Sequence, residues 1–353
     1  MTPSDGGFIA IGENIHTTRV VRRDGPHVTT AEDGREAVVF VDGAGATRYL
    51  PIPEEEKRTQ NYEEGRVKHV GIAVRLAMGG SEQDASTALA YLQTMAVRQI
   101  DAGARYLDLN VDEISLRLAD QIEAMRWLVG TIGRTASVPL SIDSSNLEII
   151  QAGLEVAADG PVGKPMLNSA SLERVDALEL AVETGGPIIA TAAGESGMPS
   201  NTDERVTNAS RMVELALGQG IPIERIYIDP LVFPISVDGE FGKHCLDAVR
   251  ELRGRYGPAI HLTGGMSNVS FGLPNRSLLN DAFLLLAVEA GADSGIIDPT
   301  MNNVERLRTV DRSARPFQLA LNVLTGADKY CREYVRAYRA GDLELPGAPA
   351  PVR

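Results

Sequence analysis

Short apolar runs and amphipathic stretches alternate along the chain. Eight runs of four to six residues combine large apolar or β-branched side chains with a polar or glycine-containing end, a pattern typical of buried parallel strands. These runs are Phe8–Gly12, Arg105–Asn110, Pro139–Asp143, Pro165–Asn168, Pro187–Ala192, Arg225–Asp229, Ala259–Thr263 and Ser294–Asp298.

The stretches between these runs place apolar residues three and four positions apart, as amphipathic helices do. They are Ala85–Ala102, Arg117–Gly133, Leu147–Ala158, Leu172–Thr184, Asp203–Gln219, Gly242–Arg255 and Ser277–Ala290. Glycines at 103, 185, 220 and 291 follow four of them, where a helix stops and the chain turns into the next strand. Eight strands alternating with helices predict an α/β fold of the (β/α)8 TIM-barrel type.

Two regions fall outside this repeat. Residues 17–83 form a long insertion after the first strand, and Ala37–Val41 and Thr47–Leu50 flank a glycine-containing turn that predicts a β-hairpin on the barrel's C-terminal face. A charged linker is expected to follow, and the pattern leaves a decorative hairpin, a lid and a docking surface open. Residues 316–340 predict a terminal helix and 341–353 a disordered, proline-rich tail, so we expect one domain over 1–340.

Polar side chains stand at the end of nearly every predicted strand, and the carboxyl ends of barrel strands share one mouth. They are Glu13 with Asn14, Asp108 with Asn110, Asp143, Asn168, Thr191, Asp229, Asn268 just beyond Gly264-Gly265, and Asp298. Any one of them alone is explained by a helix N-cap or a loop hydrogen bond. Six or more at one mouth indicate a polar ligand, and carboxylates beside carboxamides suit a neutral heterocycle with N–H donors, such as a pterin ring.

Other chemistries have weaker support. The five histidines show none of the HxxH, HExxH or HxH spacings of a zinc site, so we expect no bound metal, and His16 could either face the mouth or be a neutral loop residue. Thr263-Gly264-Gly265 could offer backbone N–H groups to an anion, but neither a GxGxxG nor a Walker pattern follows it. Cys245 lies in a helical pattern and no GxSxG occurs, which disfavours nucleophilic catalysis.

Composition excludes several partners. The formal net charge of −14, with no strongly basic segment, disfavours nucleic acid. No apolar run reaches the about 18–20 residues that a membrane-spanning helix needs, and the N-terminus lacks a signal-peptide pattern. Two cysteines without CxxC spacing agree with a reducing compartment, so we expect a cytoplasmic protein with no membrane partner.

The strand-end residues also carry a family likeness. The motifs are GENIHTTR (12–19), GARYLDLNVDE (103–113), PLSIDSSNLEIIQAGLE (139–155), KPMLNSAS (164–171), GMPSNTDER (197–205), IYIDPLVFP (226–234) and GGMSNVSFGLPNR (264–276). Together they closely resemble the methyltetrahydrofolate:corrinoid-protein methyltransferases, a group that includes the folate module of cobalamin-dependent methionine synthase and shares its pterin-binding barrel with dihydropteroate synthase. The likeness covers roughly 85–353 plus the first strand, and leaves the insertion unassigned.

The resemblance implies roles for individual residues. It implies that Asp143, Asn168 and Asp229 hold the pterin ring and that Asn268 lies near N5, the nitrogen that carries the methyl group. Asp108 and Asn110 would line the same mouth, and Arg276 would face the folate tail or stabilise its loop. Asn268 and Asp143 are thus the expected catalytic residues, because N5 becomes a better leaving group when it gains a proton or a strong hydrogen bond.

The resemblance also implies the reaction and the partner. A methyl group would move between N5 of tetrahydrofolate and the cobalt of a corrinoid (cobalamin) in one-carbon metabolism, with the direction open. The chain has no DxHxxG pattern of a cobalamin-binding domain, so the corrinoid is expected on a partner protein, and the family likeness implies a homodimer. A dihydropteroate synthase-like condensation is disfavoured by SNVS in place of that family's SxR segment, and a non-catalytic folate-binding or corrinoid-docking subunit stays open.

Overall fold

The computed structural model describes residues 7–158, 160 and 162–343. These residues form two compact units, one of residues 12–166 and one of residues 7–11 and 167–343. No helix in the described ranges is long and apolar enough to cross a membrane.

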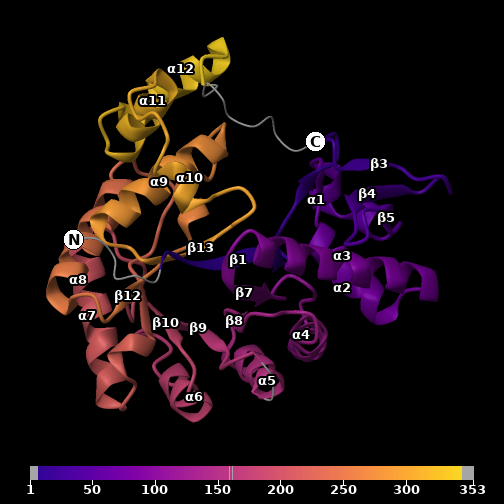
Figure 1. Cartoon of the computed structure of the whole chain (residues 1–353), viewed down its shortest axis with the longest axis horizontal. Helices are drawn as coiled ribbons and strands as arrows, with labels where there is room; N and C mark the ends of the chain where they lie inside the picture. Colours follow the sequence, from indigo (N-terminus) through magenta and orange to yellow (C-terminus); the bar gives the residue numbers. More distant parts are fainter. Residues whose placement is uncertain (1–6, 159, 161, 344–353) are drawn as a thin grey trace. The chain divides into compact units, whose positions relative to one another are not determined.

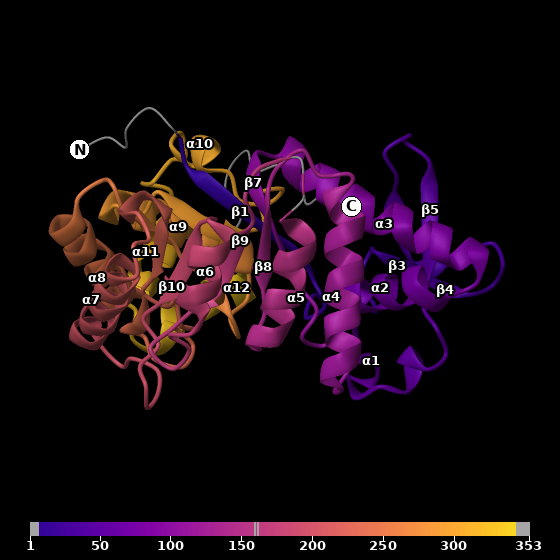
Figure 2. The same cartoon turned by 90° about the horizontal axis from the view of Figure 1, so that it is seen from below.

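In the unit of residues 12–166, three strands carry the predicted α/β pattern. They are β1 (Ile9–His16), whose first residues lie in the other unit, β7 (Ala104–Asn110) and β8 (Leu140–Asp143), adjacent in that order. β7 and β8 are parallel, and Asn110 is paired in register with Asp143, so their carboxyl ends lie level. Helices α3 (Glu82–Asp101), α4 (Leu118–Gly133) and α5 (Leu147–Ala157) alternate with these strands, and Figure 2 shows α4 beside α5.

The unit of residues 7–11 and 167–343 continues the pattern. Its strands are β9 (Met166–Ala170), β10 (Ile188–Thr191), β11 (Ile226–Asp229), β12 (His261–Leu262) and β13 (Ser294–Ile297). β9 to β12 pair in parallel in chain order, and Ile296 of β13 donates its N–H to Gly264 O just after β12. The helices are α6 (Ala177–Thr184), α7 (Thr202–Gly218), α8 (Phe241–Tyr256), α9 (Arg276–Ala290) and α10 (Val304–Leu307), with 3-10 turns η2 (Ile223–Arg225) and η3 (Met266–Ser270).

All eight predicted strands and all seven predicted helices are present, with ends shifted by a few residues. The strands are buried because their runs are apolar on both faces: Leu107, Leu109, Ile142, Ile189 and Ile228 are fully buried. Strand order that follows chain order, with helices in every described crossover, is the arrangement of a (β/α)8 barrel.

The insertion contains the predicted hairpin and more. β4 (Glu36–Val41) pairs with β5 (Thr47–Pro51) across the glycine-containing turn, and β3 (Val28–Thr30) adds a third antiparallel strand. The segment expected to be a charged linker instead contains η1 (Glu56–Arg58) and α1 (Gln60–Glu63). Two further elements were not predicted: a ribbon of β2 (Val21–Arg22) with β6 (Arg66–Val67), and α2 (His69–Gly79).

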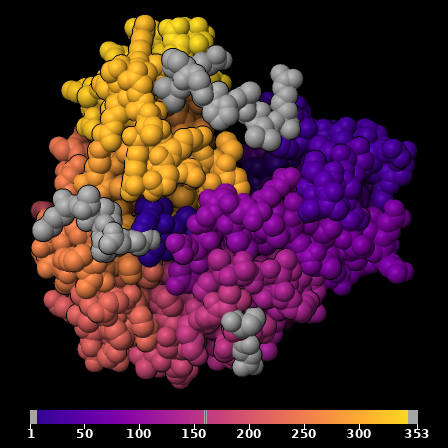
Figure 3. Space-filling view, viewed as in Figure 1, coloured from indigo at the N-terminus to yellow at the C-terminus, as the bar shows by residue number. Residues whose placement is uncertain are grey.

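The insertion packs tightly against α3, as the indigo and purple segments of Figures 1 and 3 show. The Phe40 ring meets the edge of the Tyr91 ring of α3 at a centroid distance of 4.9 Å. Tyr91 Oη in turn hydrogen-bonds His69 Nδ1 of α2 at 2.8 Å, and Arg35 is ion-paired with Asp84 at 3.0 Å. The hairpin is therefore part of the core of its unit and not an appendage.

The C-terminal region differs from the single helix predicted over 316–340. It forms α11 (Arg315–Leu324), η4 (Lys329–Cys331) and α12 (Arg332–Ala340). Gly326, Tyr330 and Cys331 have left-handed backbone angles (φ +78°, +60° and +54°), which interrupt the helix. The carboxylate of Asp328 then accepts hydrogen bonds from the N–H groups of Glu333 and Tyr334 at the start of α12. Residues 344–353 of the expected tail lie outside the described residues.

Candidate active site

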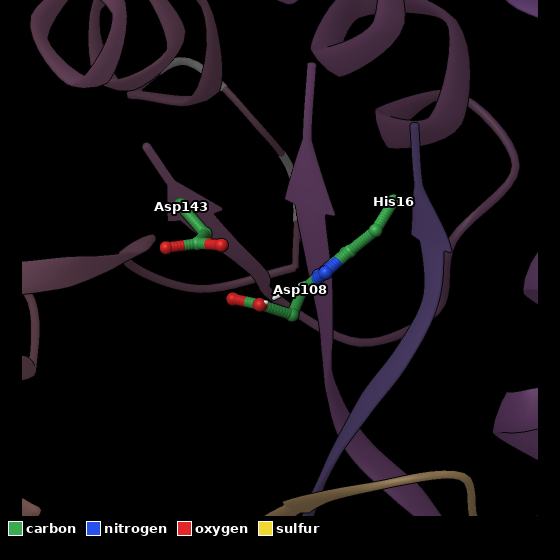
Figure 4. Close-up of side chains that lie close together, drawn as sticks. All are labelled: His16, Asp108 and Asp143. Atoms are coloured by element: carbon green, nitrogen blue, oxygen red, sulfur yellow. Dashed lines mark hydrogen bonds and ion pairs between the residues drawn. The ribbon is translucent and has the colours of Figure 1, made fainter. Parts of the chain in front are cut away.

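Three titratable side chains meet at the carboxyl ends of β1, β7 and β8. His16 Nε2 lies 2.8 Å from Asp108 Oδ2, and Asp143 extends from β8 toward the same pair (Figure 4). Asp108 is completely buried, whereas His16 and Asp143 are half-buried. The three residues come from three successive strands of one unit, so this arrangement is a product of the parallel topology.

Amide and hydroxyl groups hold these carboxylates in place. Asn110 stands two residues after Asp108, so both side chains point to one face of β7, and Asn110 Nδ2 donates to Asp143 Oδ2 at 2.8 Å. Asp112, which the motifs did not single out, accepts from Ser144 Oγ at 2.5 Å and from the N–H of Ser145 at 2.8 Å. It thereby fixes the loop that follows Asp143.

Burial and neighbouring charge shift both titrating groups. Burial and the like charge of Asp108 together raise the pKa of Asp143 to about 7, while the charge of His16 and the Asn110 hydrogen bond oppose the rise. Burial alone would lower the pKa of His16, but the hydrogen bond and charge of Asp108 outweigh it, so the pKa of His16 is raised. A pKa of about 7 places the titration of Asp143 near neutral pH.

The same cluster is the candidate for a metal site. Among the described residues, His16, Asp108 and Asp143 form the one group of three whose potential ligand atoms all lie within 4.8 Å of one another. The direct His16–Asp108 and Asn110–Asp143 hydrogen bonds already account for their approach. The arrangement is thus explained as a hydrogen-bonded acid–base cluster, and the expectation of no metal stays a prediction.

A second carboxylate stands at the end of β11, in the other unit. Asp229 is buried, which raises its pKa to about 6, while hydrogen bonds from the backbone N–H groups of Leu231 and Gly265 and the charge of Arg205 oppose the rise. The Leu231 N–H donates to Asp229 Oδ1 at 2.7 Å. Asn168, at the end region of β9, is also buried.

The side chains of Asp229 and Asn268 lie close to the glycine pair that follows β12, Gly264 and Gly265. A Cβ on Gly264 would lie 3.3 Å from Asp229 Oδ1, and a Cβ on Gly265 would lie only 2.8 Å from Asn268 Nδ2. The Asn268 carboxamide therefore folds back over Gly265, and Asn268 itself is exposed on η3. The N–H of Gly265 is directed at Asp229, which explains the glycine pair without a phosphate ligand.

The structure distinguishes these residues from ordinary helix caps. Asn146, and not Asp143, accepts from the Glu148 N–H at the start of α5, and Asn201 caps α7. By contrast, Asp298 Oδ1 accepts from the N–H and hydroxyl of Thr300, and Glu13 is ion-paired with Arg19 at 2.6 Å. Asp298 and Glu13 thus serve their own loops, and Asp229 also accepts from the N–H of its own loop at Leu231, but Asp108, Asp143 and Asp229 cap no helix.

Comparisons with known proteins identify the family. The family model described as pterin binding enzyme matches residues 77–298, more than half of the chain. The chain belongs to the pterin binding enzymes. The methylcorrinoid:tetrahydrofolate methyltransferase of Eubacterium limosum is 31% identical over 263 residues, which cover 72% of this chain and 89% of that protein. The family likeness drawn from the motifs is confirmed.

Two further comparisons bear on the fold. Methionine synthase of Mycobacterium leprae is 33% identical over 218 residues, 58% of this chain but only 17% of that much longer protein. Dihydropteroate synthase structures from Xanthomonas albilineans and Stenotrophomonas maltophilia both superpose with a TM-score of 0.51, at 17% and 18% identity, covering 65% and 64% of this chain and 86% of each of those chains. The predicted (β/α)8 TIM barrel of this pterin binding enzyme is confirmed.

In this pterin binding enzyme, Arg276 hydrogen-bonds residues of the 3-10 turn that contains Asn268. Its Nε donates to Ser270 Oγ at 3.0 Å and its Nη2 to Ser267 O at 2.8 Å, and its guanidinium lies 5.7 Å from the Phe271 ring centroid. Of the two roles expected for Arg276, these contacts correspond to stabilising the loop.

Proposed function

We propose that this chain transfers a methyl group between N5 of tetrahydrofolate and the cobalt of a corrinoid carried by a partner protein. The observation that carries the proposal is the set of strand-end carboxylates that cap no helix, with Asp108 and Asp229 buried and Asp143 half-buried. The chain is also similar to a methylcorrinoid:tetrahydrofolate methyltransferase over most of that protein's length. Membership in the pterin binding enzymes supports the folate side of the reaction.

Carboxylates suit the donor edge of a pterin. The 2-amino group and the adjacent ring N–H can both donate to one carboxylate, and Asp143 and Asp229 are acceptors when ionised. The amides of Asn110 and Asn168 can complete the recognition of the ring. Because the pKa of Asp143 is raised to about 7 and that of Asp229 to about 6, folate binding should weaken as the pH falls through this range.

Asn268 is assigned to the reacting nitrogen. Its carboxamide is exposed and lies over Gly265, so Nδ2 can donate a hydrogen bond to N5 while carrying no charge. A donor aimed at the atom that gains electron density as the C–N bond breaks lowers the barrier in both directions. The direction therefore depends on the partner and the metabolic supply.

A methyl-transfer assay tests the proposal. Purified protein is mixed with 5-methyltetrahydrofolate and cob(I)alamin, and with tetrahydrofolate and methylcobalamin, and the cobalamin spectrum is followed. We expect turnover in at least one direction. Asn268→Ala should lower kcat by about 100-fold while changing folate affinity little, and Asp143→Ala should mainly weaken folate binding.

Ser277→Ala, an exposed substitution on the first turn of α9, is the matched control for Asn268→Ala and should behave as wild type. An unchanged kcat in Asn268→Ala would show that the role given to Asn268 is wrong. Folate binding without turnover would favour a non-catalytic subunit, and pyrophosphate release from a pterin diphosphate would favour a synthase-type condensation.

A further inference from the structure

A buried arginine lies behind the loop that follows Asp229. Arg205, in the first turn of α7, is completely shielded from solvent and is the largest of the fully buried side chains. Among the described residues it takes part in no ion pair. Removing a guanidinium from water without a direct counter-ion is costly, and an apolar side chain of similar volume would fill such a position more favourably.

The guanidinium instead binds backbone carbonyl groups of two loops. Nη1 donates to Asn201 O at 3.1 Å and to Pro199 O at 3.4 Å, in the loop between β10 and α7. Nε donates to Leu231 O at 3.4 Å, in the loop between β11 and α8. Arg205 thus ties together two of the loops that follow barrel strands.

Two aromatic rings, those of Phe233 and Phe241, pack against the Arg205 guanidinium. Its carbon lies 4.9 Å from the ring centroid of Phe233 and 5.7 Å from that of Phe241, within cation–π range. The two rings also pack edge to face, 5.3 Å apart. The side chain is therefore held in one position, with a fixed direction toward Leu231.

Leu231 connects Arg205 to Asp229. Leu231 has a left-handed backbone (φ +69°), a conformation that costs a residue with a side chain free energy unless neighbouring groups maintain it. Its carbonyl accepts from Arg205 Nε, and its N–H donates to Asp229 Oδ1 at 2.7 Å. The peptide groups of Leu231 therefore connect the Arg205 guanidinium to the Asp229 carboxylate, so that displacing one should displace the other.

We propose that Arg205 is a positioning residue for Asp229, which it orients through the left-handed turn at Leu231. The role of Asp229 in binding folate rests on the proposed function, whereas the positioning of Asp229 by Arg205 does not. The sequence indicated no role for Arg205, although this residue ends the motif GMPSNTDER (197–205).

The electrostatics of Asp229 agree with this role. The charged or titratable groups that act on Asp229 are Arg205 from α7 and Cys245 from α8, together with the N–H groups of Leu231 and Gly265. Arg205 lowers the pKa of Asp229, whereas burial raises it. Removing the cation should therefore raise the pKa of Asp229, so that a higher pH is needed to ionise it.

The test measures the titration of Asp229 directly. Carboxyl signals of 13C-labelled aspartate are titrated in wild type, Arg205→Met and Arg205→Lys, with the Asp229 signal assigned as the one missing in Asp229→Asn. We expect the Asp229 midpoint to rise by about half a pH unit or more in Arg205→Met, and by less in Arg205→Lys, which keeps the charge but not the planar fork.

Arg225→Met is the matched control. Arg225 also binds backbone carbonyls, with Nε at 2.9 Å from Gly186 O and Nη2 at 2.8 Å from Ala181 O, but at the opposite end of β11. Its loss should lower stability without moving the Asp229 midpoint. An Asp229 midpoint that stays at the wild-type value in Arg205→Met, or that moves equally in Arg225→Met, overturns the proposal.

If Arg205→Met is too unstable to titrate, a second pair of variants tests the same link through stability. Leu231→Gly adopts the left-handed turn without strain, so Arg205→Met should destabilise the protein less in the Leu231→Gly background than in wild type. Equal destabilisation in both backgrounds contradicts the link through Leu231. If wild type binds no reduced folate, the proposed function fails, while the Asp229 titration still decides the role of Arg205.

Discussion

Asp143→Asn should stabilise the folded protein at alkaline pH while it weakens folate binding. The pKa of Asp143 is raised from 3.8 to about 7, chiefly by burial and then by Asp108. Between these two pH values the folded protein holds a proton that the unfolded chain has released. The stability that this proton supplies is lost as the pH rises through the window, and above pH 7 the folded state contains a buried carboxylate.

The magnitude follows from the shift. Raising a pKa by about 3 units corresponds to about 4 kcal/mol above pH 7, at about 1.4 kcal/mol per unit. Because Asp143 titrates together with His16 and Asp108, we expect the gain in Asp143→Asn to be about 1–4 kcal/mol at pH 8 and to vanish near pH 4. An asparagine can still accept the hydrogen bond that Asn110 donates.

Urea unfolding of wild type and Asp143→Asn across this pH range measures the difference. Asp101→Asn, an exposed carboxylate at the end of α3 in the same unit, is the control and should shift the free energy of unfolding by no more than about 0.5 kcal/mol at any pH. A difference in the free energy of unfolding between wild type and Asp143→Asn that stays constant with pH would refute the reasoning. It would show that Asp143 titrates alike in the folded and unfolded states.

Three further predictions concern other parts of the chain. Gly265→Ala should lower the methyl-transfer rate more than folate affinity, because its Cβ would lie 2.8 Å from Asn268 Nδ2 and displace that carboxamide; an unchanged rate would contradict the assignment of Asn268. Gly45→Ala should destabilise the hairpin by about 1 kcal/mol in urea unfolding, because Gly45 has φ +82°, whereas Gly43→Ala, where a Cβ meets open space, should cost less. Cys245 is buried, with its pKa raised to about 12, so a thiol reagent should label it only after unfolding; rapid labelling of the native protein would count against this burial.

The sequence predicted the strands because each is a short apolar run that needs no information from elsewhere in the chain. It did not predict α2, because buried residues follow one another from His69 to Val74 without the spacing of an amphipathic helix. The single helix expected over 316–340 is broken at Gly326, where a left-handed glycine follows the end of α11. The burial pattern hid the first element, and backbone conformation at single residues decided the second.

The candidate site shows the same division. The motifs identified Asp108, Asp143 and Asp229 as strand-end residues, and the structure places all three at the ends of their strands. The raised pKa values of Asp143 and His16 depend on three strands brought side by side, and no spacing in the sequence encodes them. The position of Arg205 likewise depends on carbonyl groups of two loops, one of which, at Leu231, lies 26 residues further along the chain.

The contact between the insertion and α3 makes this hairpin an obligatory part of folding. Phe40 and His69 both depend on Tyr91, and the carbonyl of Val41 accepts from Arg98 at 3.0 Å, so α3 is covered by chain that precedes it. Removing the hairpin would leave an aromatic face of α3 in water. We expect amides of β4 and α3 to exchange with solvent deuterium at one common slow rate, as members of a single cooperative unit.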